Sequence, residues 1–160
     1  EEGGRRIREF LNGVKEVPVI STTGRGTFEA TIRGHGESLR IEYKLTYRRL
    51  EGAVTQAHIH VGPPQNSGGV SAWLCGNPSP TVNPPPDTPT CPPSPSTSSE
   101  PQAVVEGTIT AADVVGPAAQ GIAAGELEEL VALIYAGKTY ANVHSAKIPG
   151  GEIRSQLHVH

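Results

Sequence analysis

Two histidines separated by a single residue are the first feature with chemical potential. His58 and His60 stand in "AHIHVGPP", residues 57 to 64, between apolar neighbours. Successive side chains of a β-strand point to opposite faces, so on a strand both imidazoles would point the same way. Imidazole nitrogen is a common ligand for copper and zinc. The pair is therefore either two polar side chains on a solvated strand face or two ligands of one metal ion.

A third histidine could join this pair. In "KTYANVHS" the alternation directs Ala141 and Val143 toward a core and His144 away from it. If the strand that contains His58 and His60 lies beside this one, three imidazoles meet on one face. Three nitrogen ligands suit copper, with zinc as the alternative, and they leave a coordination position open. We therefore expect these three histidines to bind a metal ion.

The end of the sequence carries two more histidines. The short loop "AKIPGG" between residues 139–145 and "GEIRSQLHVH" predicts an antiparallel hairpin. Face matching and a tight loop pair His144 with Arg154, which puts His158 opposite Tyr140, about 13 Å along the strand from His144. His158 and His160 are then poor candidates for the same ion. They form a candidate secondary metal site, which could also bridge two chains in a homodimer.

Further polar residues on the same outward face could support the ion. Gln56, Asn142 and Tyr140 would orient its ligands. Arg154 would guide a small anion or oxidant toward the open position, or it would pair with a carboxylate such as Glu152. Glu152 itself could add an oxygen ligand or accept hydrogen bonds from the amides of its own turn.

The elements that would position these residues are mostly strands. Residues 38–48, "SLRIEYKLTYR", alternate apolar and polar side chains without a break, which is the pattern of a half-buried antiparallel strand. His35, in the glycine-rich "RGHGES", is expected to be a turn residue. About eight short strands separated by turns predict an all-β antiparallel sandwich or barrel. Further strands are expected at 14–20, 26–32, 53–61, 69–74, 103–109, 139–145 and 152–159.

One helix interrupts this pattern. Within residues 121–137, four apolar side chains fall at the i, i+3, i+4, i+7 spacing of one helix face. They are Leu127, Leu130, Val131 and Ile134. The spacing predicts one short amphipathic crossover helix against the sandwich.

Two cysteines bracket a proline-rich segment. Cys75 and Cys91 are the only cysteines, and little else in the sequence would hold the ends of their loop together. A disulfide would remove about 3 kcal/mol of unfolded-state entropy and would imply an oxidising compartment; the alternative is two free thiols in the cytosol. Residues 76–102 are rich in Pro, Ser and Thr, so we expect a mobile or extended loop. A partner that accepts proline-rich peptide is a second interpretation of this loop.

Length and composition set the outer limits. The 160 residues fit a single domain, 1–160, with the proline-rich segment as an insert. The net charge of −3 and the scattered basic residues argue against nucleic acid as a partner. No apolar run approaches the roughly 18 residues of a membrane-spanning helix, and the first residues lack the apolar region of a signal peptide.

Several segments together resemble the CHRD domain, the repeat named after chordin that also occurs singly in bacterial secreted proteins. They are "FLNGVKEVP", "AHIHVGP", "GTITAADV" and "LIYAGKTYANVHSAKIPGGEIRSQL". The resemblance covers roughly residues 8–157; the proline-rich insert and the final "HVH" are peculiar to this chain. It implies an extracytoplasmic β-sandwich, secreted or periplasmic, and in chordin the domain belongs to a protein that binds growth factors.

A more distant resemblance bears on the chemistry. Copper/zinc superoxide dismutases are Greek-key β-barrels with a His-x-His copper pair, a later copper histidine and an arginine near the C-terminus that guides the anion. His58 and His60, His144 and Arg154 follow the same order. No histidine lies between residues 60 and 144, so the bridging ligand and the zinc loop have no counterpart. The resemblance therefore implies a Greek-key sandwich or barrel with a mononuclear copper site.

Three functions remain open from the sequence. The first is copper binding for storage, transfer or sensing. The second is a redox enzyme that acts on superoxide or another small oxidant. The third is a metal-free extracellular module that binds a protein or another ligand. The missing bridging histidine favours the first over the second, and whether the chain is an enzyme stays open.

Overall fold

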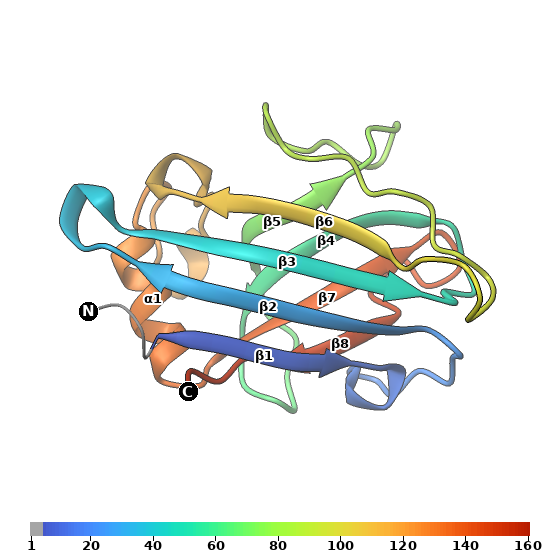
Figure 1. The fold of residues 1–160 in the computed structure, drawn as a ribbon. Coiled ribbons are helices and arrows are strands. Elements are labelled where there is room, and N and C mark those ends of the chain that lie inside the picture. The colour runs from blue at the N-terminus through green and yellow to red at the C-terminus, as the bar shows by residue number, and fades with distance from the viewer. Residues whose placement is uncertain (1–4) are drawn as a thin grey trace.

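Two four-stranded antiparallel sheets pack face to face in the computed structural model, which describes residues 5–160 (Figure 1). The strand orders are β1-β2-β3-β6 and β5-β4-β7-β8. The all-β sandwich is confirmed, and within residues 5–160 the sheets do not close into a barrel. The strands are β1 (Arg6–Leu11), β2 (Arg25–Arg33), β3 (Arg40–Arg48), β4 (Val54–Val61), β5 (Val70–Gly76), β6 (Ala103–Ile109), β7 (Thr139–Ser145) and β8 (Ile153–Gln156).

The hydrophobic core lies between the two sheets. Alternation along β3 buries Ile41 and Leu45 completely, and in the other sheet Ala57 and Ile59 of β4 are equally buried. Because successive side chains alternate, each strand turns its remaining residues to the outer face of its sheet. The polar residues of β4 and β7 therefore lie on the side away from this core.

A crossing connection links the sheets. After β3, the chain passes to the other sheet for β4 and β5, and β6 then returns to pair with β3. Such a return beside an earlier strand is the connection that a Greek-key arrangement requires. The same crossings place β4 and β7, far apart in sequence, next to each other.

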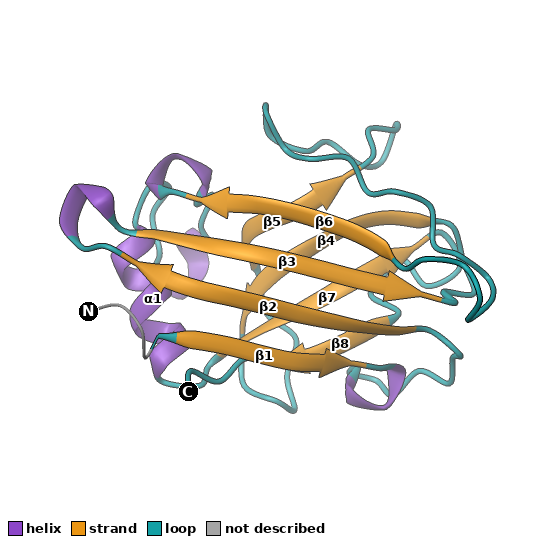
Figure 2. Cartoon of the chain, viewed as in Figure 1, coloured by secondary structure: helices purple, strands orange, loops and turns teal. Residues whose placement is uncertain are grey.

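Helix α1 (Leu127–Tyr135) covers one end of the sandwich (Figure 2). Its four predicted apolar residues are all buried, as expected. The expected range of 121–137 is too long, because Gly125 takes a left-handed conformation with φ of 89° just before the helix begins. The other helical segments are 3-10 turns at Gly13–Lys15, Gly36–Ser38, Ala111–Asp113 and Ala118–Gln120. Within residues 5–160, every helix is too short to cross a lipid bilayer.

The first strand differs from the prediction. Residues 14–20 are not a strand; the segment begins as a 3-10 turn capped by the side chain of Asn12 and then passes through Pro18, which has no N–H for a ladder. The strand lies earlier, at β1, where Ile7 and Leu11 are buried. Glu9 occupies the position between Ile7 and Leu11 on the same face, so the sequence of β1 does not show a regular alternation of apolar and polar residues.

A disulfide closes the first part of the proline-rich segment. Cys75 and Cys91 are bonded, with an S–S distance of 2.01 Å, so the predicted disulfide is confirmed. Beyond it the chain runs extended along the sandwich, where the Arg49 amide donates to the carbonyl of Pro95 at 2.7 Å. The Tyr47 hydroxyl likewise donates to the carbonyl of Pro92. These contacts hold the part of the segment after Cys91 against the end of β3.

Candidate metal centre

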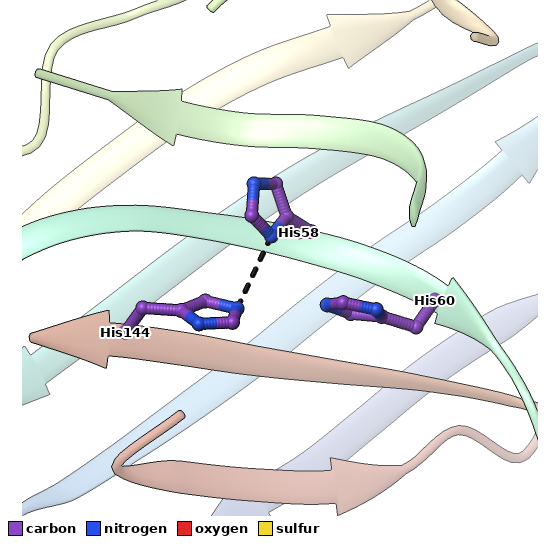
Figure 3. A group of neighbouring side chains, drawn as sticks. All are labelled: His58, His60 and His144. Carbon is purple, nitrogen blue, oxygen red and sulfur yellow. Dashed lines mark hydrogen bonds between the residues drawn. The ribbon is translucent and has the colours of Figure 1, made fainter. Parts of the chain in front are cut away.

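Strand pairing brings the three predicted histidines together. β4 and β7 are antiparallel neighbours, which is the arrangement on which the metal hypothesis depends. One nitrogen from each of His58, His60 and His144 lies within 4.8 Å of the other two, and Figure 3 shows their rings facing a common point. The cross-strand partners are Gln56 with His144, His58 with Asn142, and His60 with Tyr140.

The three rings lie on the outer face of their sheet, yet solvent barely reaches them. His58 is 3% exposed, and His60 and His144 are each 7% exposed. Connecting segments cover them: the carbonyls of Gly68 and Pro149 contact the rings from the loops after β4 and β7. A solvated strand face, the alternative explanation for the histidines, is therefore excluded.

Hydrogen bonds fix which ring nitrogens face the centre. His60 Nδ1 lies 3.0 Å from the Gly68 carbonyl, and His144 Nδ1 lies 2.8 Å from the Pro149 carbonyl. Since a carbonyl only accepts, both Nδ1 atoms carry the proton and both Nε2 atoms present a lone pair. Metal-binding histidines in proteins are commonly held in this way by a carbonyl on the second nitrogen.

His58 approaches the centre through its other nitrogen. Its Nδ1 lies 3.2 Å from His144 Nε2 (Figure 3). Two nitrogens bound at about 2.05 Å to one tetrahedral ion stand roughly 3.3 Å apart, so this spacing already suits two ligands of one metal. If an ion took the place of this hydrogen bond, the proton on His58 Nδ1 would move to His58 Nε2, which has no hydrogen-bond partner, and the imidazole would stay neutral.

Burial keeps the three imidazoles neutral. It lowers the pKa of His58 to about 2 and that of His60 to about 4, and it also lowers the pKa of His144. The positive charge that His144 would carry is a smaller contribution to the low pKa of His58. Neutral imidazole is the form that binds metal, so the ligands need no deprotonation at neutral pH.

Several polar atoms in this region lack a partner. His60 Nε2, His58 Nε2 and Asn142 Oδ1 are buried and make no hydrogen bond. Buried polar atoms normally have a hydrogen-bond partner, and exceptions are typical of sites that hold a water molecule or an ion or that have a functional role. A donor set of imidazoles fits copper or zinc and does not suit a hard ion such as magnesium.

An aromatic stack holds His60 from the side. The Tyr140 ring lies parallel to His60, with centroids 4.7 Å apart, and the Arg154 guanidinium lies 3.4 Å above the Tyr140 centroid. The Tyr140 hydroxyl also accepts a hydrogen bond from the Gly68 amide at 2.9 Å. Tyr140 therefore contacts both the ring of His60 and the loop that supplies its carbonyl.

The register of the last hairpin differs by two residues from the prediction. Arg154 pairs with Asn142, not with His144, and Tyr140 lies opposite Gln156, not opposite His158. The reason is the turn: the Ile148 carbonyl accepts from the amides of both Ser145 and Gly151, which moves the centre of the hairpin back by one residue. A shift of two in pairing leaves every side chain on its expected face.

Arg154 is buried and held by a loop. Its Nη2 donates to the carbonyls of Pro63 and Asn66 at 2.9 and 3.0 Å, and the whole residue is 2% exposed. It also lines a groove of about 530 Å³ together with Glu16. Among residues 5–160, no salt bridge to a carboxylate engages it, so the alternative of a direct ion pair with Glu152 is not observed.

Glu16 was not expected in this region. Its carboxylate is buried and accepts a hydrogen bond from Asn142 Nδ2 at 3.3 Å. Burial raises the pKa of Glu16 to about 7, although the Asn142 hydrogen bond and the charge of Arg154 oppose the shift. Pro18 indicates that the segment containing Glu16 is a loop, but the neighbouring sequence does not indicate which face of the sandwich this loop covers.

Trp73 of β5 was also missed. Its ring makes an edge-to-face contact with His58, with centroids 4.4 Å apart. β4 pairs with β5 through two register irregularities, one on each side of the His58–Ile59 step. Bulges of this kind re-aim side chains and are frequent beside functional sites.

The other candidate residues have separate surroundings. Gln56 lies opposite His144 and is partly exposed. Glu152 accepts from the Glu51 amide at 2.7 Å, so it satisfies an amide of the turn between β3 and β4 and not, as expected, the amides of its own turn. His35 begins an exposed turn, as expected. His158 contacts β1 and not the three buried histidines.

Substitution of Gly151 is expected to disturb the polar contacts beside the histidines. Its φ is 126°, and a Cβ there would overlap Asn142 Nδ2 and Glu16 Oε2. Gly151→Ala should lower the free energy of unfolding by about 2 kcal/mol in urea titrations. The adjacent Gly150 has open space around its Cα, so Gly150→Ala is the matched control and should change stability by less than about 0.5 kcal/mol. Equal effects of the two substitutions would contradict the close packing at Gly151.

Comparison with known proteins gives one match. No curated protein and no solved structure matches the chain, so the likeness to superoxide dismutases stays a hypothesis. The family model that does match is described as the CHRD domain, and it covers residues 8–157. This span contains all three histidines and both cysteines. The chain belongs to the CHRD domain family.

Proposed function

We propose that the protein binds a single copper ion through His58 Nδ1, His60 Nε2 and His144 Nε2. The observation that carries the proposal is the convergence of three buried, neutral imidazoles, two of them oriented by carbonyls. In residues 5–160 this is the only group of three whose ligand atoms all lie within 4.8 Å of one another. A mononuclear site follows, and zinc is the alternative ion because it accepts the same donors.

The chain's own residues would supply orientation and exclusion of water. Gly68 and Pro149 hold the two Nδ1 protons, Tyr140 stacks on His60, and Trp73 closes the side of His58. A bound copper ion would supply one-electron redox chemistry. Such a dry, preorganised site suits storage, transfer or sensing of copper, since the ligands need little rearrangement to accept the ion.

A redox enzyme is the second candidate, and Arg154 is the observation that favours it. Its guanidinium lines the groove beside Glu16, where it could attract a small anion or oxidant. A superoxide dismutase assay on the copper-loaded protein, compared with an Arg154→Met variant, separates the two functions. Activity that falls in the variant while copper stays bound would support the enzyme, and absence of activity would leave copper binding alone.

Copper titration followed by electron paramagnetic resonance tests the main proposal. The experiment uses the His158→Ala/His160→Ala chain, so that the exposed pair cannot contribute. One equivalent of Cu(II) should give nitrogen hyperfine structure from three imidazoles, and adding His58→Ala/His60→Ala should abolish it. His35→Ala, which removes an exposed histidine elsewhere, should leave the spectrum unchanged. A spectrum that survives the double substitution at His58 and His60 would refute the assignment.

Membership of the CHRD family also supports an extracellular interaction module that needs no metal. Together with the disulfide, it is consistent with an extracytoplasmic location; secretion or a periplasmic location is our proposal within that. If neither copper nor zinc binds more tightly than roughly micromolar, the metal-free module is the better explanation. The proline-rich segment would then be the surface to test for a protein partner.

A further inference from the structure

The final residues lie along the first strand. Val159 forms an antiparallel bridge with Ile7, and the His160 amide donates to the Arg6 carbonyl at 2.7 Å. Side chains two residues apart on an extended segment share one side. The bridge therefore holds the backbone of His158 and His160 beside β1.

Glu9 stands between these imidazoles. Its Oε2 accepts hydrogen bonds from the backbone amide of His158 at 3.2 Å and from His158 Nδ1 at 3.0 Å, and it lies 3.9 Å from His160 Nε2. The Glu9 side chain is 16% exposed, whereas the two rings are 56% and 67% exposed. A largely buried carboxylate thus lies close to two imidazoles that solvent can reach.

The geometry points to a second metal site: we propose that Glu9, His158 and His160 bind a divalent transition-metal ion, copper or zinc. Two ligands of a tetrahedral ion at about 2.05 Å stand roughly 3.3 Å apart. The distances of 3.0 and 3.9 Å from Glu9 Oε2 to the two imidazoles bracket that value. The ligand atoms of Glu9, His158 and His160 do not all lie within 4.8 Å of one another, so the exposed rings would have to turn toward each other to hold one ion.

The charge and proton balance are favourable. The Glu9 carboxylate supplies one negative charge, which partly neutralises the charge of the metal ion. Three neutral ligands would not reduce that charge. His158 now donates its Nδ1 proton to Glu9. On binding, the proton moves to Nε2, which faces solvent, and Nδ1 becomes a ligand; the imidazole stays neutral and no net proton is released.

This site differs from the buried one in access. Its three candidate ligands come from two chain segments, and more than half of each imidazole side chain is exposed. We expect weaker binding and faster exchange than at His58, His60 and His144. Glu9 and His158 line the same groove as Glu16 and Arg154, so a loosely held ion would sit at the wall of that groove.

Copper binding to two variants tests the second site independently of the first. Wild-type protein should take up two equivalents of Cu(II) in isothermal titration calorimetry, and His158→Ala/His160→Ala should take up one. A chain with His58, His60 and His144 all changed to Ala should retain one weaker equivalent, with hyperfine structure from two nitrogens. If this triple variant fails to fold, the comparison of wild type with His158→Ala/His160→Ala decides alone.

The role of the carboxylate needs its own variant. Glu9→Gln keeps the shape and can still accept from the His158 amide, so the fold should persist while the second equivalent is weakened or lost. His35→Ala serves as the exposed-histidine control and should still bind two equivalents. A second equivalent that persists in His158→Ala/His160→Ala, or an unaltered one in Glu9→Gln, would overturn the proposal. If the wild type lacks the tighter equivalent but keeps the weaker one, the buried site is refuted and the site at Glu9, His158 and His160 is still supported.

Discussion

Replacement of Cys75 and Cys91 by serine is expected to lower the free energy of unfolding by about 3 kcal/mol and the melting temperature by roughly 6–12 °C. The disulfide closes a loop with a sequence separation of 16 residues, and breaking it frees the unfolded chain to adopt more conformations. Both cysteines are buried at the end of β5, so the loss falls on the sheet that carries His58. Urea unfolding of the double serine variant and of the wild type measures this difference in the free energy of unfolding.

Reduction of the wild-type protein provides the matched measurement. Dithiothreitol should lower the urea midpoint of the wild type to that of the serine variant and should leave the variant itself unchanged. Part of the loop stays anchored in both cases, because the Asn77 side chain bonds the amide and the carbonyl of Cys91 at 2.9 and 3.1 Å. A loss below about 1 kcal/mol would mean that these hydrogen bonds, and not the disulfide, hold the loop.

The orientation of the histidines could be predicted because it depends only on alternation. In β4 and β7 the apolar residues Ala57, Ile59, Ala141 and Val143 point to the core, so His58 and His144 point away from it in any register. The error of two residues in pairing β7 with β8 did not matter for this reason. The face to which a side chain points depends only on its position within its own strand, so errors in the predicted loops do not change it.

The cover over the histidines could not be predicted, because it rests on contacts between distant segments. Glu16 reaches Asn142 across 126 residues, and Arg154 reaches the Pro63 carbonyl across 91. Local patterns contain no information about such pairs, and β1 was itself misplaced because Glu9 interrupts its apolar alternation. Burial of the imidazoles, which decides their protonation, was therefore visible only in the folded chain.

Acidification of the metal-free protein from pH 6.5 to 4.5 is expected to lower its free energy of unfolding by up to about 5 kcal/mol. In the folded protein, burial lowers the pKa of His58 to about 2 and of His60 to about 4, and it lowers the pKa of His144. The unfolded chain protonates these imidazoles near their ordinary value of 6.5. Below that pH the unfolded state binds more protons, and each imidazole then costs about 1.4 kcal/mol per pH unit.

Glu16 acts in the opposite direction over the same range. Burial raises its pKa to about 7 from the ordinary value of 4.5, so the folded state holds a proton that the unfolded state releases. Stability from this group rises as the pH falls. His58 and His60 against Glu16 leave a net effect of one group. A full contribution from His144, whose pKa is also lowered, would make it two groups, which over two pH units sets the upper limit of about 5 kcal/mol. Glu42 and Glu51 act outside this window, because their pKa values are lowered below 4.5.

Urea unfolding at half-unit pH steps measures the slope. His58→Leu/His60→Leu leaves His144 and Glu16, whose effects oppose each other, so the variant should lose much less stability than the wild type between pH 6.5 and 4.5. The measured quantity is the change in the free energy of unfolding with pH within each variant. A substitution that lowers stability equally at every pH therefore does not affect the test. Glu16→Gln should make the wild-type slope steeper. An equal slope in the wild type and the double leucine variant would mean that the two imidazoles are not held neutral by burial, and their readiness to accept a metal at mildly acidic pH would lose its physical basis.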